Sequence, residues 1–317
     1  APDGRVFVAI SASHFLDTSG SGKWSYVASH LDGGRDNYGS ACMYDNGKVV
    51  YTGGGDPPLA TGEMIDLNVE SPAWTFIAEM PEVRRQQNTT LLPDGRVLVT
   101  GGSSSGGFNT EDVPKSAIVW DPDVNEWTTW ATEDQYRGYH SEAVLLPDGR
   151  VVSLGGDGHP SLQVFSPPYL FNGPRPTITS APEAVSLGET FLVETTDSAS
   201  VFVAGGQVNL LRACAVTHTK NMNQRINRLS FREVAGGLEV SVPASRNLCP
   251  PGDYMLFLVN SNGVPSVASW IRVTRATPVK LDFESWPPTE TWGTTSHDGW
   301  TLSVGQVKQN RGGFSPP

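Results

Sequence analysis

The feature that most limits the fold of this sequence is a short phrase that recurs four times: Asp or Asn, then Gly, then Lys or Arg, then Val. Its glycines are Gly4, Gly47, Gly95 and Gly149, which are spaced by 43, 48 and 54 residues. Asp-Gly and Asn-Gly supply the positive φ of a tight hairpin turn, and an apolar run follows each of them. Since the last three copies end in Gly-Gly, the phrase predicts a turn, a buried strand and a second turn.

Segments that contain tryptophan separate the later copies, at Trp74 and at Trp120 with Trp127. A turn, a Gly-Gly and a tryptophan at an interval of 43–54 residues are typical of the blades of a kelch-like β-propeller. We therefore expect propeller blades across residues 1–172. A propeller must close to remove its sheet edges. Because the first copy begins in mid-repeat, at Ala1-Pro-Asp-Gly, we expect an incomplete ring.

The second half of the chain has a different composition. A Pro- and Gly-rich linker begins at Gly173, and short, regularly spaced apolar runs follow it and end near Val273. Such runs predict an immunoglobulin-like β-sandwich over residues 173–274. Residues 275–317 open with another strand-like run, which predicts the start of a further, truncated β domain. The sequence therefore predicts an all-β chain, with a partial kelch-like propeller followed by the sandwich.

Charge and hydropathy argue against two classes of protein. The net charge of -11 disfavours nucleic-acid binding, because phosphate contacts need clustered Lys and Arg. The longest apolar runs, such as residues 255–259, are far shorter than the roughly 20 residues that a membrane span needs. The cysteines leave two alternatives open: Cys214 and Cys249 pair while Cys42 stays free, or two or three of them are buried free thiols.

Candidate metal ligands stand just ahead of the fourth copy of the phrase. Tyr139 and His140 are adjacent there, before a predicted strand, and His218 follows 78 residues after His140. Two imidazoles and a phenolate form a mixed nitrogen and oxygen ligand set that suits Cu(II) in a tetragonal site. The alternative for each histidine is ordinary hydrogen bonding at the surface or in the core.

Several runs surround these candidates: Arg-Gly-Tyr-His-Ser at 137–141, Phe-Ser-Pro-Pro-Tyr-Leu-Phe-Asn at 165–172, Thr-His-Thr at 217–219, Asn-Gln-Arg at 223–225 and Asn-Ser-Asn-Gly-Val-Pro-Ser-Val at 260–267. Together they resemble the copper-radical oxidases, galactose oxidase and glyoxal oxidase. The resemblance covers most of residues 35–274. It implies a kelch-type propeller with a C-terminal early-set sandwich, from which one loop delivers a copper ligand. It also implies a secreted protein, located outside the cell or at its surface.

Taken residue by residue, the resemblance implies copper ligands at Tyr139, His140 and His218. It also implies that Tyr139 is the base that takes the proton of the substrate hydroxyl. The family's other tyrosine ligand is cross-linked to a cysteine. Here Gln86 stands at the position of that tyrosine and Tyr38 at the position of that cysteine. We therefore expect no Tyr–Cys cofactor, and we predict that Tyr38 acts as the fourth ligand or as an uncross-linked redox tyrosine.

Two functions fit these residues. The first is a divergent copper-dependent oxidoreductase that uses O₂ to oxidise a small alcohol, aldehyde or carbohydrate. The alternative is a non-catalytic, secreted module that binds a glycan or a protein and keeps a vestigial metal site. Peroxide release that depends on Tyr38 would separate the two.

Overall fold

The computed structural model describes residues 1–10, 12–33, 38–108, 113–197, 202, 205–275, 294–297 and 300–303. Its contacts divide the chain into two compact units, Ala1–Thr277 and Pro278–Pro317. In the second unit, a hairpin of β25 (Thr294–His297) and β26 (Trp300–Ser303) is described. The rest of the predicted further β domain lies outside the described residues, apart from its first residue, Arg275.

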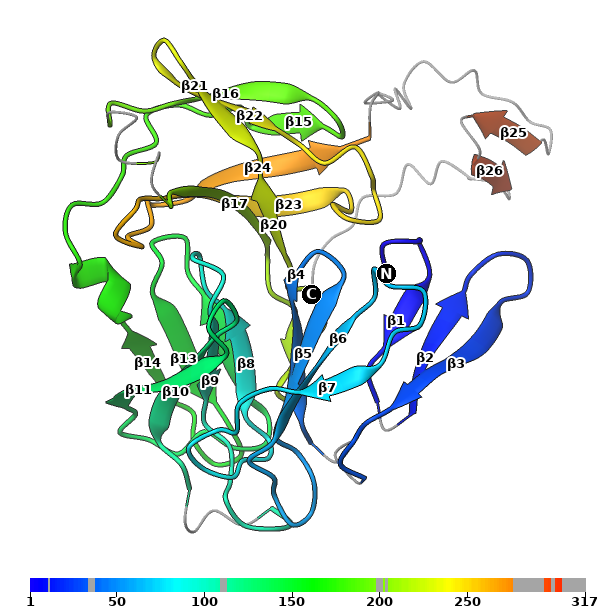
Figure 1. Cartoon of the computed structure of the whole chain (residues 1–317), viewed down its shortest axis with the longest axis vertical. Helices are drawn as coiled ribbons and strands as arrows, with labels where there is room; N and C mark the ends of the chain where they lie inside the picture. Colours follow the sequence, from blue (N-terminus) through cyan, green and yellow to red (C-terminus); the bar gives the residue numbers. More distant parts are fainter. Residues whose placement is uncertain are drawn as a thin grey trace, which may run out of the picture. The chain divides into compact units, whose positions relative to one another are not determined.

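Four small antiparallel sheets follow one another along the first part of the chain (Figure 1). The first contains β1 (Val6–Val8), β2 (Ala12–Asp17) and β3 (Lys23–Ser29). The second contains β4 (Ser40–Asp45), β5 (Lys48–Thr52), β6 (Gly62–Asp66) and β7 (Trp74–Phe76). The third contains β8 (Asn88–Leu91), β9 (Val97–Thr100), β10 (Ser116–Asp121) and β11 (Glu126–Thr132). The fourth contains β12 (Ser141–Leu145), β13 (Val151–Gly155) and β14 (Leu162–Phe165).

Within each of these sheets, strands that are consecutive in the chain are neighbours in space. This is the arrangement of propeller blades, and it confirms the all-β, propeller-like fold that the repeated phrase predicts. The turns between β4 and β5, β8 and β9, and β12 and β13 contain the last three copies of the phrase, with their glycines at positive φ.

The carboxylate of Asp94 shows why a basic residue follows Asp-Gly in the phrase. Its Oδ1 accepts the backbone N–H of Arg96 at 3.1 Å, and its Oδ2 accepts Arg96 Nε at 2.8 Å. The same two bonds join Asp3 to Arg5 and Asp148 to Arg150. The phrase is therefore a self-bracing turn, in which an Asx-type bond and an ion pair share one carboxylate.

The Gly-Gly pairs after β5 and β9 are required by the blade that follows each of them. A Cβ on Gly101 would lie 2.2 Å from the carbonyl oxygen of Arg137. Gly102 donates its N–H to the same carbonyl at 2.7 Å. Gly53 approaches the carbonyl of Arg84 in the same way, with a Cβ distance of 2.3 Å. Neighbouring blades are thus joined through their backbones, at a distance that no other residue permits.

After the 3₁₀ turn η1 (Pro168–Phe171), the chain forms a two-sheet sandwich. One sheet has the order β15 (Ala184–Ser186), β24 (Ser269–Thr274), β23 (Gly252–Val259), β17 (Gln207–Arg212) and β20 (Ile226–Leu229). The other has the order β16 (Thr190–Glu194), β22 (Gly237–Ser241) and β21 (Phe231–Val234). Alternate residues of both sheets fill the core between them, among them Val193, Val240 and Leu256, each fully buried.

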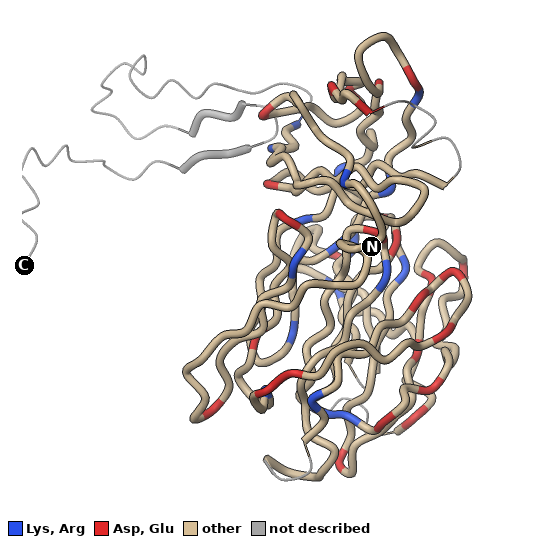
Figure 2. Tube along the Cα trace, turned by 90° about the vertical axis from the view of Figure 1, so that its left-hand side faces the viewer, with Lys and Arg blue, Asp and Glu red and all other residues tan. Residues whose placement is uncertain are grey.

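The sandwich packs against the blades through a shared apolar core. One cluster of buried residues includes Val50 and Leu91 from the blades together with Leu211 and Phe257 from the five-stranded sheet. Cys42 and Cys249 are buried, and all three cysteines are free thiols, so the pairing of Cys214 with Cys249 is not seen. Acidic and basic residues both occur on the sandwich and on the blades (Figure 2). None of the helices described in the structure is both long and apolar enough to cross a membrane.

Candidate metal centre

The structure brings all of the predicted site residues together from distant parts of the chain. Tyr38 precedes β4, and Tyr139 and His140 precede β12. His218 lies in the turn of a separate hairpin, β18 (Val216–Thr217) with β19 (Lys220–Asn221). The ring centroids of Tyr38 and Tyr139 are 5.4 Å apart, and those of His140 and His218 are 4.7 Å apart. The ring of Tyr139 lies 3.8 Å from His140 and 5.6 Å from His218.

The hairpin that carries His218 comes from the sandwich and packs against three blade strands, β4, β8 and β12. Ser40 Oγ, at the start of β4, donates to the carbonyl of Thr219 at 2.9 Å and fixes the tip of the hairpin. A sandwich loop therefore delivers a histidine to residues that two blades supply.

Each of the backbone segments that present these side chains is strained. Tyr38 and His140 have φ of 62° and 61°, and the two turn residues His218 and Thr219 have φ of 52° and 63°. A left-handed φ is uncommon for any residue with a Cβ and is an outlier for a β-branched threonine. Strain of this kind persists where the surrounding structure holds it and is typical of functional sites.

Gln86, expected in place of a ligand tyrosine, lies just before β8, as Tyr139 lies just before β12. It also has a left-handed φ, 59°, and its N–H donates to the carbonyl of Tyr38 at 2.7 Å. Its side chain is fully buried, and its Oε1 has no hydrogen-bond partner among the described residues. Whether Gln86 replaces that ligand tyrosine stays a prediction.

Both histidines have one ring nitrogen engaged and one left for a metal. Nδ1 of His140 lies 2.7 Å from Asp157 Oδ1, and Nδ1 of His218 lies 2.7 Å from Thr217 Oγ1. The nitrogen that remains for a ligand bond is Nε2 in both rings. A carboxylate on the second nitrogen is a recurring partner of metal-binding histidines, because it fixes the ring and makes the ligand nitrogen more basic.

The phenol of Tyr139 has a pKa above its ordinary value. Partial burial disfavours the phenolate, the neighbouring phenol of Tyr38 adds to this through its charge and a hydrogen bond, and Asp157 contributes further. Tyr139 is therefore protonated at neutral pH when no metal is bound. A group held in this state is a strong base once it is ionised.

The donor chemistry fits Cu(II). Two imidazole nitrogens and two phenol oxygens make a mixed set of the kind that copper prefers, and Cu–N bonds are of the order of 2 Å, as for other divalent ions. Within the described residues, no group of three or more His, Cys, Asp and Glu side chains suited to a metal occurs. The histidines are grouped with tyrosines instead.

Two contributors to this region were not predicted. Phe108, after β9, packs edge-on against Tyr139 at 5.0 Å and against Tyr38 at 5.5 Å. Asp157 binds His140 and also donates its N–H to the carbonyl of Tyr139 at 3.1 Å. A signal for Asp157 was present, because it directly follows the Gly-Gly of the fourth copy of the phrase.

Asp157→Asn tests the carboxylate as a partner of the metal site. We expect copper affinity to fall roughly 10-fold. This is the low end of the range for residues that hydrogen-bond to a metal ligand, because this carboxylate is exposed. Asp148→Asn, in the turn at the other end of the same hairpin, is the matched control and should leave affinity unchanged. Competitive Cu(II) titration measures both, and equal affinities for the two variants would refute this role for Asp157.

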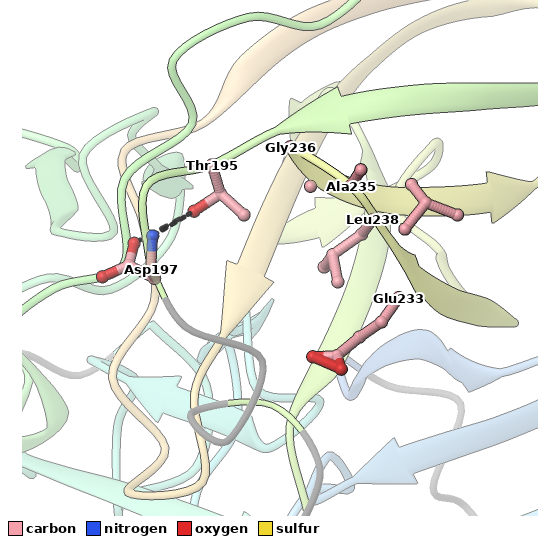
Figure 3. Close-up of a pocket in the computed structure, with 8 residues that line it drawn as sticks. Thr195, Asp197, Glu233, Ala235, Gly236 and Leu238 are labelled. Atoms are coloured by element: carbon pink, nitrogen blue, oxygen red, sulfur yellow. Dashed lines mark hydrogen bonds between the residues drawn. The ribbon is translucent and has the colours of Figure 1, made fainter.

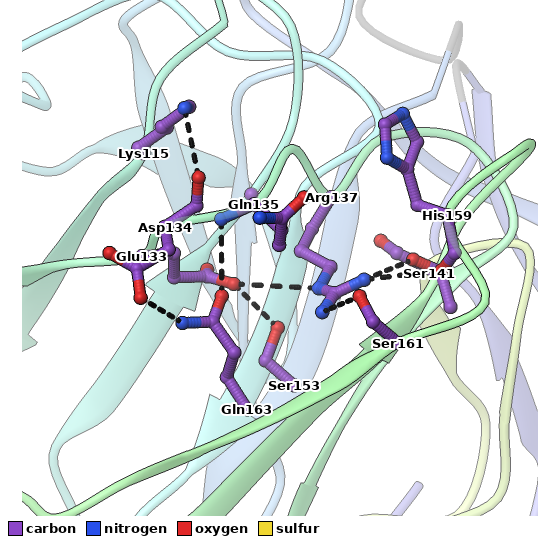
Figure 4. A network of polar contacts seen from close by, with 12 residues as sticks. Lys115, Glu133, Asp134, Gln135, Arg137, Ser141, Ser153, His159, Ser161 and Gln163 are labelled. Atoms are coloured by element: carbon purple, nitrogen blue, oxygen red, sulfur yellow. Dashed lines mark hydrogen bonds and ion pairs between the residues drawn. The ribbon is translucent and has the colours of Figure 1, made fainter.

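A buried arginine anchors the segment that presents Tyr139 and His140 (Figure 4). Arg137 Nη1 donates to the carbonyls of Gly155 and His159 at 2.9 and 3.3 Å, and Nη2 donates to Ser161 Oγ at 3.0 Å. Its Nε lies 3.9 Å from Glu133. The site therefore rests on a network that locks the start of β12 to the end of β13.

A cavity of about 430 Å³ lies elsewhere, on the sandwich (Figure 3). It is lined by residues around Thr195, Asp197 and Glu233, none of which belongs to the tyrosine and histidine cluster. Inside it, Thr195 Oγ1 and the backbone N–H of Asp197 are hydrogen-bonded. This cavity is not connected to the predicted chemistry.

Comparison with known proteins confirms the family resemblance that the sequence indicates. The family model "Galactose oxidase-like, Early set domain" matches residues 175–273. The chain is 33% identical over 262 residues to "Galactose oxidase" of Gibberella zeae, covering 75% of this chain and 38% of that protein. It is 30% identical over 319 residues to "Aldehyde oxidase GLOX" of Vitis pseudoreticulata, covering 86% and 60%. The chain thus spans less than two thirds of the length of these relatives.

A solved structure is similar as well. It is titled "Novel fungal alcohol oxidase with catalytic diversity among the AA5 family, in complex with copper". The TM-score is 0.78 at 28% sequence identity, and the match covers 86% of this chain and 61% of that one.

Proposed function

Since the chain belongs to the galactose oxidase and glyoxal (aldehyde) oxidase family, we propose that it is a copper-dependent oxidase of a small alcohol, aldehyde or carbohydrate. In the alcohol reaction, the substrate loses two electrons and two protons and becomes an aldehyde. O₂ takes up both and becomes hydrogen peroxide. The substrate would reach the site from outside the cell, since we also propose that the protein is secreted.

One observation carries this proposal. Tyr38, Tyr139, His140 and His218 come from two blades and a sandwich hairpin, yet the ring centroids of the other three lie 5.4, 3.8 and 5.6 Å from that of Tyr139. A purely structural role would not need four polar rings in this arrangement. Three of them belong to residues with a left-handed φ, and the fourth, Tyr139, is next to one of these. Their convergence is what a bound copper ion requires.

The chain's residues would share the work as follows. His140 and His218 would hold copper through Nε2, and Tyr139 through its phenol oxygen. Copper, when bound, would supply Lewis acidity and a one-electron redox step. Tyr139 Oη would take the proton of the substrate hydroxyl.

Tyr38 is the candidate for the remaining position. Its ring stands at 90° to that of Tyr139, and the two ring centroids are 5.4 Å apart. We propose that Tyr38 is the fourth ligand or an uncross-linked redox tyrosine. Because an unmodified phenol is harder to oxidise than a cross-linked one, slow turnover is expected.

The experiment is peroxide release by the copper-loaded chain on methylglyoxal, glyoxal and galactose. Tyr38→Phe should lower the rate at least about 100-fold, the low end of what a side chain that takes part directly in the chemistry contributes. Tyr26→Phe is the matched control, because Tyr26 is an exposed tyrosine on β3. A rate that Tyr38→Phe leaves unchanged would remove Tyr38 from the mechanism.

The alternative function has its own outcome in this experiment. Absence of stoichiometric copper and of peroxide in the folded chain would favour a binding module that uses the propeller and sandwich as a scaffold. Copper at one ion per chain without peroxide on any of these substrates would leave the metal site in place and exclude these substrates.

A further inference from the structure

A buried arginine lies against the aromatic part of the site and has no role in the chemistry proposed above. The guanidinium carbon of Arg85 is 4.9 Å from the centroid of the Tyr38 ring, and its side chain is 2% exposed. Its backbone N–H and carbonyl are both bonded to Ser103, at 3.0 and 2.8 Å. The carbonyl of Tyr38 is bonded to the next residue, Gln86. Arg85 is therefore fixed relative to Tyr38 through backbone and ring alike.

Asp56 connects this arginine to a neighbouring loop. Its Oδ2 lies 2.6 Å from Arg85 Nη1 and accepts the N–H of Gly107 at 3.2 Å. Gly106 packs so closely that a Cβ there would lie 2.4 Å from Asp56 Oδ1. The bond from Arg85, and then that from Gly107, lower the pKa of Asp56. The carboxylate is therefore ionised at neutral pH, and the loop is docked on it.

The docked loop carries Phe108, which completes an aromatic cluster with Tyr38 and Tyr139. Its ring meets both phenols edge-on and is 57% exposed, so it is open to a ligand. Gln86 Nε2 adds a weaker tether, to the carbonyl of Gly107 at 3.4 Å. The Asp56–Arg85 ion pair thus supports two rings. Arg85 stacks on the ring of Tyr38, and Asp56 binds Gly107, the residue before Phe108.

We propose that Asp56 and Arg85 are positioning residues that hold Tyr38 and Phe108 in this cluster, and so determine how tightly an alcohol or aldehyde packs against Tyr139. The substrate side of the inference rests on the proposed oxidase function, whereas the positioning side rests on contacts alone. The planar guanidinium matters, because arginine stacks on an aromatic face and pairs with a carboxylate at once, which lysine does not do equally well.

The first measurement is hydrogen–deuterium exchange over residues 103–108 in the full chain. In Asp56→Ala, exchange at Gly107 should become several-fold faster, because its N–H loses its acceptor. Asp253→Ala is the matched control, since it breaks an exposed Asp–Arg pair on the sandwich, with Arg272 at 2.8 Å. Exchange over 103–108 that is equal in the two variants would overturn the positioning role.

The second measurement is steady-state oxidation of benzyl alcohol and galactose by the copper-loaded variants. Asp56→Ala should raise KM about 10-fold and lower kcat by less than Tyr38→Phe does, since Tyr38 loses a support but is not removed, and Tyr139 and both histidines are untouched. Arg85→Lys keeps the ion pair but not the stacking. It should retain slow exchange over 103–108, yet raise KM.

The two measurements fail separately. If exchange becomes faster while KM stays at the wild-type value, the pair holds the loop but does not affect substrate binding. The substrate side of the proposal is then overturned. If the wild-type chain oxidises neither alcohol, oxidation of these alcohols is what fails. Exchange over 103–108 alone then decides whether Asp56 and Arg85 position the cluster.

Discussion

His140→Ala and His218→Ala are each expected to abolish stoichiometric copper binding, with a loss of affinity of at least about 100-fold. The estimate is a lower bound, because removing even an outer partner of a ligand costs 10–100-fold. Each histidine contributes one free Nε2, and the two rings are 4.7 Å apart, so neither can be replaced by the other. Metal analysis and the nitrogen splitting in the Cu(II) EPR spectrum report the loss directly.

The controls for this result separate ligand loss from misfolding. His14→Ala removes an imidazole on β2, which packs between Trp24 and Tyr26 and is remote in the fold from the hairpin of His218. It should bind copper like the wild type. His218→Asn keeps a residue that tolerates the left-handed turn, so its folding should be intact while copper is lost. One copper per chain retained in His140→Ala or in His218→Ala would contradict the ligand assignment.

The blades were predictable because their signals are local. Asp94-Gly95 and the apolar run after it specify a turn and a strand within a few residues, and the structure places β8 and β9 on either side of that turn. The grouping of Tyr139 with His140 was predictable for the same reason. Placing His218 beside them depended on resemblance, since nothing within its own hairpin indicates which blades the hairpin enters.

The residues that were missed act across the fold. Phe108 and Asp56 reach the site from loops after β9 and β5, and their contacts depend on how neighbouring blades pack. Asp56 and Asp157 do share a signal, because each follows a run of glycines at the end of a buried strand. An acid at that position lies close to the left-handed residues of the site, a relation that only the assembled blades reveal.

Arg137→Met is expected to lower the free energy of unfolding by roughly 3–5 kcal/mol, the cost of breaking a buried charged network. The side chain is 1% exposed and donates to two carbonyls and a hydroxyl, all of which would lose a charged donor. Arg150→Met is the control. Arg150 is paired with Asp148 at the surface, and its loss should cost less than about 1 kcal/mol. Urea unfolding of the two variants measures the difference.

The pH dependence of that loss identifies its cause. Burial raises the pKa of Glu133, while Arg137 and a hydroxyl from Ser153 oppose the rise. A carboxyl whose folded pKa is raised destabilises the protein once it ionises, so its penalty is absent below the unfolded pKa and complete above the folded one. Without Arg137 the folded pKa of Glu133 rises further.

The cost of Arg137→Met should therefore grow from pH 4 to pH 7, and adding Glu133→Gln should recover part of it at pH 7 only. A cost that is the same at both pH values would mean that the lost hydrogen bonds to Gly155 and His159, rather than the buried charge, account for the role of Arg137.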